Sequence, residues 1–177
     1  MPVTGCFWAH SENSQGNKHR LKDHLESVAI QARKFAEIAI PSDSQFIDAA
    51  YWAGLLHDFG KYSDLFQRRL VDPSIRGVDH WSSGALSLAN AKQLLSAYAV
   101  YGHHLGIPNS TEIINLIKCG NSNLPETMEE LKKRQIDDGF SPSITNGKPL
   151  IGPPIVFERG RNISRSHEEA PPNRQRR

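Results

Sequence analysis

Cysteine is scarce in this sequence. The only two cysteines among its 177 residues are Cys6 and Cys119, which lie far apart in the chain. Two distant cysteines exclude a disulfide framework and a Cys-x-x-Cys redox or zinc motif. Sparse cysteine is typical of proteins from the reducing cytoplasm, so we expect a cytoplasmic location.

Long apolar runs are also missing. No run approaches the roughly 18 residues that indicate a membrane span. The first residues lack the basic region and apolar core that mark a signal peptide. We therefore expect neither a membrane span nor a membrane partner.

An excess of charge of one sign is absent from most of the chain. The net charge is +2, but residues 158–177 alone carry six Arg and three Glu, which is +3. The first 157 residues therefore have a net charge of −1, the difference between +2 and +3. Bulk charge gives no indication that this part binds nucleic acid.

Helical periodicity is what the sequence does contain. Apolar residues recur at intervals of three and four, and the expected helices span 19–39, 46–56, 64–70, 80–90, 93–104, 111–119 and 125–137. We expect Ser42 or Ser44 to cap the second helix, Ser110 to cap the sixth, and Gly60 to stop the second in a left-handed conformation. Without internal repeats or useful strand-like alternation, the sequence predicts an all-α helical bundle.

The residues after 137 have a different composition. Seven Gly and Pro residues fall between 139 and 154, and almost no apolar residue occurs in 158–177. Such segments break regular elements and cannot bury enough apolar surface to fold. We expect one domain in residues 1–137 and a disordered tail in residues 138–177.

An adjacent imidazole and carboxylate, His57 and Asp58, follow the most apolar of the expected helices. Ionisable side chains are seldom buried without partners, and a metal ion is the simplest partner for several of them together. Lys61 follows closely enough to meet a phosphate oxygen or developing negative charge. The pattern predicts a metal-dependent hydrolase with Asp58 and Lys61 as candidate catalytic residues.

Six side chains in four segments are candidate metal ligands: His24, His57, Asp58, His80, His103 and His104. Imidazole and carboxylate donors without thiolate suit Mn, Fe, Co, Ni or Zn. Six ligands are too many for one catalytic ion, which keeps positions open for water and substrate, so two divalent ions fit better. Asp58 is the natural bridge, because its two oxygens can serve two ions roughly 3.5–4 Å apart.

Each candidate also has a simpler interpretation. His24 can be a hydrogen-bonded core histidine, and His57 with Asp58 can form a helix cap. The histidines of the last two segments can belong to a cap region and a surface turn. Lys61 can be a solvated lysine at a helix end. The joint occurrence of all these residues favours the metal site.

Three further histidines fall outside this ligand set. His19 precedes the helical periodicity, and His167 lies in the expected tail. His10 follows an aromatic pair and can lie near the site, so its role stays open.

The candidate residues occur in segments with a recognisable order. The segments are Phe7-Trp8-Ala9-His10-Ser11, Leu21-x-x-His24-Leu25, Gly54-Leu55-Leu56-His57-Asp58-Phe59-Gly60-Lys61, Asp79-His80-x-Ser82-x-Gly84-Ala85 and Gly102-His103-His104-Leu105-Gly106. Over about residues 6–110 this order resembles the HD superfamily of metal-dependent phosphohydrolases. Within it, the segments resemble the HD nuclease domain of the type I CRISPR-associated helicase-nuclease.

The resemblance implies an HD-type nuclease domain that cuts single-stranded DNA, as an endonuclease or exonuclease, in antiviral defence. It implies activation of water by two metals, the first held by His24, His57 and Asp58. The second metal's ligands would be Asp58, His80, His103 and His104. It also implies two partners, a separate helicase subunit and a guide-RNA surveillance complex.

The sequence departs from this family towards its end. The family supplies a further metal-binding aspartate well after the double histidine, whereas the last aspartates here, Asp137 and Asp138, close a polar helix. A phosphate-binding Gly-Lys-Thr loop of a helicase is also missing. The alternatives are therefore a phosphohydrolase acting on nucleotides or phosphomonoesters, and an inactive copy truncated at its C-terminal end.

Overall fold

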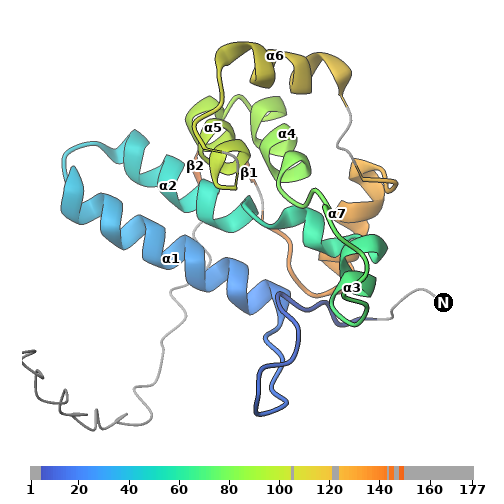
Figure 1. Ribbon diagram of the computed structural model, residues 1–177. Coiled ribbons are helices and arrows are strands. Elements are labelled where there is room, and N and C mark those ends of the chain that lie inside the picture. The colour runs from blue at the N-terminus through green and yellow to red at the C-terminus, as the bar shows by residue number, and fades with distance from the viewer. Residues whose placement is uncertain (1–4, 105, 121–123, 143, 146–147, 150–177) are drawn as a thin grey trace, which may run out of the picture.

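The computed structural model describes residues 5–104, 106–120, 124–142, 144–145 and 148–149 (Figure 1). The elements are α1 (Leu21–Ala39), α2 (Ser44–Leu56), the 3-10 helix η1 (Phe59–Tyr62), α3 (Asp64–Arg69), α4 (Ser82–Asn90), α5 (Leu94–Gly102), α6 (Ser110–Cys119), α7 (Met128–Asp137), β1 (Ile144–Thr145) and β2 (Lys148–Pro149). The predicted all-α class is confirmed. In the described part of the chain, no helix is long and apolar enough to cross a bilayer.

Helices α1 and α2 form the long pair at the base of the fold and lie side by side (Figure 1). Leu21, Leu25 and Ala29 are fully buried along one face of α1. At Gly54 of α2, a Cβ atom would stand 2.7 Å from the Cα atom of Ala29. The glycine therefore permits a close helix crossing, which brings the start of α1 near the end of α2.

Helices α4 and α5 pack on α2, and α6 lies across both of them (Figure 1). Gly84 allows α4 to approach the backbone of Leu56, because a Cβ atom there would overlap the Leu56 carbonyl oxygen. Leu86, Leu88 and Val100 are buried in this layer. The C-terminal end of α5 and the start of α4 therefore lie close to the end of α2.

Two helix caps differ from the sequence-based expectation. Asp43, not Ser42 or Ser44, caps α2 by accepting a hydrogen bond from the Phe46 amide. Asn109, not Ser110, caps α6. Such one-residue differences are normal, because several small polar residues in a row can each cap a helix.

Gly60 has a different role from the predicted one. Helix α2 already ends at Leu56, and Gly60 lies inside η1. Its amide donates to the His80 carbonyl at 3.0 Å, and a Cβ atom would stand only 2.7 Å from the Cα atom of His80. The glycine therefore allows close approach of the His80 segment instead of stopping a helix.

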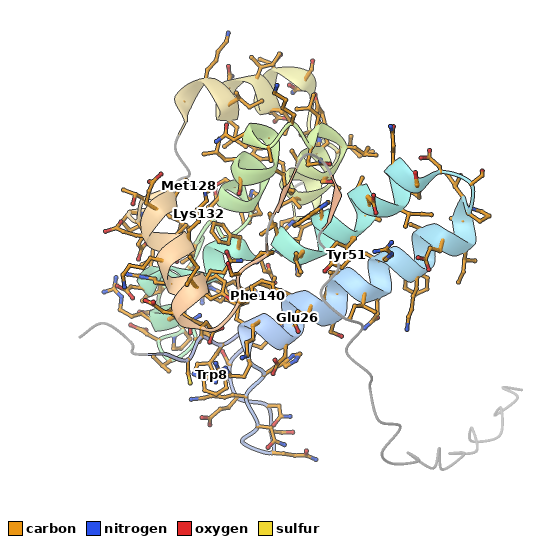
Figure 2. All side chains as sticks on the ribbon, turned by 180° about the vertical axis from the view of Figure 1, so that it is seen from behind. Trp8, Glu26, Tyr51, Met128, Lys132 and Phe140 are labelled. Carbon is orange, nitrogen blue, oxygen red and sulfur yellow. The ribbon has the colours of Figure 1, made fainter. Side chains whose placement is uncertain are left out.

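The body of the protein extends past the predicted boundary at residue 137. Asp138 and Phe140 are buried, and Figure 2 shows Phe140 in the interior between α7 and α1. Strands β1 and β2 pair in antiparallel fashion, with Ile144 opposite Pro149. The predicted start of the tail was therefore too early, since single apolar residues among Gly and Pro can still join a core. The rest of the predicted tail, from residue 150, lies outside the described residues.

Candidate metal centre

Asp58 lies at the end of α2, where the helix gives way to η1. Leu56 is the last residue of α2, His57 keeps helical dihedral angles, and Asp58 leaves them with φ −113° and ψ 24°. This break in the helix lets two consecutive side chains face one pocket, which a continuous helix would direct about 100° apart. Asp58 is only 3% exposed.

One oxygen of Asp58 faces two histidines, one in α1 and one directly after α2. The Oδ2 atom lies 3.2 Å from Nε2 of His24 and 3.0 Å from Nε2 of His57. The two histidine nitrogens are themselves 3.2 Å apart. His24, His57 and Asp58 thus offer three ligand atoms within 4.8 Å of one another.

The other oxygen of Asp58 faces a second set of histidines. The Oδ1 atom lies 3.4 Å from Nε2 of His80 and 3.8 Å from Nε2 of His103. His104 joins them, with its Nε2 atom 2.8 Å from that of His80. The four residues again offer ligand atoms within 4.8 Å of one another.

In three of these histidines, a hydrogen bond to a backbone carbonyl determines which ring nitrogen is free to bind a metal. The Nδ1 atoms lie against carbonyl oxygens: His57 against Gly54 at 2.7 Å, His80 against Val78 at 3.1 Å, and His103 against Val100 at 2.6 Å. A carbonyl only accepts, so Nδ1 donates the proton and Nε2 keeps its lone pair. Metal-binding histidines are commonly oriented in this way. The donor set therefore fits divalent transition-metal ions.

The ionisation of the cluster also suits a cation. Burial alone raises the pKa of Asp58, but the imidazoles of His103, His24 and His57 outweigh it and leave the pKa well below its ordinary range. Burial lowers the pKa of His80 to about 4, so its ring is neutral at pH 7. Burial also lowers the pKa of His104. A buried carboxylate beside the neutral His80 ring attracts a metal ion.

Lys61 is buried beside the same carboxylate. Its Nζ atom lies 2.7 Å from Oδ2 of Asp58 and donates to the Ala9 carbonyl at 3.0 Å. The residue is only 6% exposed, so it is not a solvated lysine at a helix end. Its ammonium group shares one oxygen with the first histidine pair and helps to hold Asp58 in position.

A pocket of about 470 Å³ opens over this cluster. All seven residues proposed from the sequence line it, namely His24, His57, Asp58, Lys61, His80, His103 and His104. Arg69 of α3 and His10 also line it. Arg69 is a second positive charge at the pocket that the sequence reasoning did not identify, because its place depends on how α3 packs.

A third group of histidines was also missed. His10, His19 and His24 offer ligand atoms within 4.8 Å of one another. His19 precedes the periodic part of α1, but Trp8 pairs with Arg20 in an isolated β-bridge that brings the segments of His10 and His19 together. The spacing along the chain gave no signal for that pairing.

The late aspartate implied by the resemblance does not join the centre. In the part of the chain that the structure describes, Asp58 is the only carboxylate in the clusters suited to a metal. Asp138 is buried, but its side chain pairs with Arg20 and accepts from the Tyr62 hydroxyl at 3.3 Å. Asp138 is therefore a buried residue and not simply the last residue of a polar helix. Its contacts with Arg20 and Tyr62 stabilise the fold and do not reach the Asp58 cluster.

Comparison with known proteins gives one match. A family model for the HD domain matches residues 21–138, about two thirds of the chain. This range contains both sets of residues around Asp58. No curated protein and no solved structure matches the chain.

Proposed function

Because the chain belongs to the HD-domain family, whose members are metal-dependent hydrolases, we propose that it hydrolyses phosphodiester bonds with two divalent ions bridged by Asp58. The division of the two Asp58 oxygens between separate histidine sets is the observation that carries this proposal. In this proposal, His24 and His57 would hold one ion together with Asp58. His80, His103 and His104 would hold the other.

The chain's own residues would orient the substrate. Divalent ions bound there would lower the pKa of water and neutralise charge on phosphorus-bound oxygens. Lys61 holds the Asp58 carboxylate in place, and Arg69 offers a guanidinium to a phosphate oxygen at the pocket. Mn, Fe, Co, Ni and Zn all accept imidazole with carboxylate, so any of them is a candidate ion.

The proposed substrate is single-stranded DNA, cut during type I CRISPR antiviral defence. The support is the order of the sequence segments from Phe7 to Gly106, which resembles the nuclease domain of that system. A helicase subunit and a guide-RNA surveillance complex would be the partners. An extended strand could lie across the pocket, because His103 and His104 are exposed at its edge.

A nucleotide or a phosphomonoester is the second candidate substrate. The pocket volume of about 470 Å³ is in the range of small-ligand sites. Hydrolysis of such a compound would need the same centre and no helicase partner. The two candidate activities differ in their substrate: the nuclease cuts a polynucleotide, whereas the second enzyme acts on single nucleotides or phosphomonoesters.

The test is to incubate the protein with circular single-stranded DNA, and separately with nucleotides, in the presence of Mn, Co or Ni. Cutting of the circle supports the nuclease, and phosphate release from nucleotides without cutting supports the second candidate. Asp58→Asn is the inactive comparison, and Asp137→Asn is the matched control, because Asp137 is exposed and pairs with Lys133 on the surface of α7. Equal activity in wild type and Asp58→Asn would contradict both candidates.

A further inference from the structure

The N-terminal segment folds back on itself before α1 begins. Trp8 and Arg20 form an antiparallel bridge, and the Ala9 amide donates to the His19 carbonyl at 2.9 Å. We call residues 8–20 the N-terminal hairpin. Lys18 and Glu12 close its outer part with a salt bridge of 2.9 Å. His10 and His19 therefore lie close together at the base of the hairpin.

The hairpin brings these two imidazoles to His24, one turn into α1. The ring centroids of His10 and His24 are 5.0 Å apart, and those of His19 and His24 are 5.6 Å apart. Each residue offers a nitrogen within 4.8 Å of the others. Histidines drawn from three points of the chain thus converge on one position.

The base of the hairpin is held firmly against the body. Gln67 accepts from the Trp8 amide at 3.1 Å and donates to the Trp8 carbonyl at 3.0 Å. The Ser11 hydroxyl donates to the Leu70 carbonyl at 3.0 Å. These bonds hold the segment on both sides of His10, so little backbone entropy is lost when its ring binds a ligand.

We propose that His10, His19 and His24 bind one divalent transition-metal ion, at a site beside the Asp58 centre. Three imidazoles and no carboxylate favour Zn, Ni, Co or Cu over Mg or Ca. His10 and His19 are exposed, so a fourth position stays open to water or an anion. The site does not depend on the proposed hydrolase activity, since it needs neither Asp58 nor His80.

His24 links this site to the Asp58 centre. Its Nε2 atom lies 3.2 Å from Oδ2 of Asp58, so that nitrogen already faces the centre. A neutral imidazole has one nitrogen with a free lone pair, so His24 can serve both ions only if its other ring nitrogen releases its proton to the solvent. Occupation of the hairpin site therefore changes the affinity of the first ion of the Asp58 centre.

The test measures metal binding and needs no activity assay. Metal-free protein is titrated with Zn²⁺ by calorimetry and with Co²⁺ by visible absorption, and bound metal is counted after dialysis. The variants are His10→Gln and His19→Gln, with His167→Gln as the matched control. Because both hairpin histidines are exposed, these substitutions leave the core untouched.

Wild type and His167→Gln are expected to bind one more ion than either hairpin variant, or to bind it about 100-fold more tightly, the upper range for weakened metal sites. Equal stoichiometry and affinity in wild type and both hairpin variants would overturn the inference. The Asp58→Asn background separates the two proposals. If the Asp58→Asn variant still binds an ion and the double variant with His10→Gln does not, that ion occupies the hairpin site. This result would support the hairpin site even if the Asp58 centre holds no metal.

Discussion

Two aspartates of this protein are equally buried and have opposite surroundings. Asp58 and Asp138 are each 3% exposed. Asp138 pairs with the Arg20 guanidinium and the Tyr62 hydroxyl, between α1 and α7. Asp58 is surrounded by imidazoles, with Lys61 as its one ammonium partner among the described residues, and it opens on a pocket.

The difference lies in the chemistry of the partners. Arg20 is charged at every accessible pH, so the charge of Asp138 is neutralised within the protein. The histidines around Asp58 can lose their protons and then present lone pairs instead of positive charge. Burial alone does not indicate a metal site, whereas a buried carboxylate among several imidazoles does.

The largest expected effect follows substitution of Asp58. Asp58→Asn removes the negative charge that both histidine sets share, and metal-assisted hydrolysis should fall about 1000-fold, since several kcal/mol of stabilisation depend on the ions. Initial rates with single-stranded DNA or nucleotide substrates, and metal content after dialysis, measure the effect. Unchanged metal content would contradict the assigned role of Asp58.

Asp138→Asn should act on stability and not on metal. Arg20 would lose its charged hydrogen-bond partner in a partly exposed position, which should lower the free energy of unfolding by about 2 kcal/mol. Urea unfolding of metal-free protein measures this change. Metal content should equal that of wild type, and its loss would show that the two aspartates are not functionally separate.

Titration of His80 should make the surroundings of Asp58 sensitive to pH. The folded pKa is about 4, below the ordinary 6.5, so between these values the unfolded chain binds a proton that the folded chain does not. The contribution of His80 to the free energy of unfolding is therefore fully present above pH 6.5 and is lost as the pH falls towards 4.

His80→Gln should remove this contribution, which we put at about 2 kcal/mol after allowing for partial solvent access. Unfolding free energies between pH 7 and 4, in chelator, should fall less steeply in the variant than in wild type. Parallel curves would show that His80 does not bind its proton more weakly in the folded state.

The smallest effect concerns the open side of the Asp58 pocket. Arg69→Ala should raise KM about fivefold, because one charge-assisted hydrogen bond to phosphate is lost at an exposed position. Arg68→Ala is the matched control, since Arg68 is an exposed neighbour on α3 that does not line the pocket. An equal rise in both variants would indicate a general charge effect.

Much of the fold was predictable from local patterns. The interval of three and four predicts the helices, since it depends on neighbours along one helix face. Caps and ends were less predictable: Asp43 and Asn109 replaced the expected serines, and Gly60 serves a contact with His80. The resemblance likewise implied a further metal-binding aspartate, but neither Asp137 nor Asp138 belongs to the described clusters around Asp58.

The sequence by itself determined the helical class and the residue types that the pocket would contain. His57 and Asp58 stand out because two ionisable side chains follow an apolar run, and that signal is local. Only the tertiary structure decided which oxygen of Asp58 faces which histidines, that Lys61 is buried, and that His10 and His19 reach His24. These contacts join segments far apart in the chain, and they depend on helix packing, whose distances and angles no short-range pattern specifies.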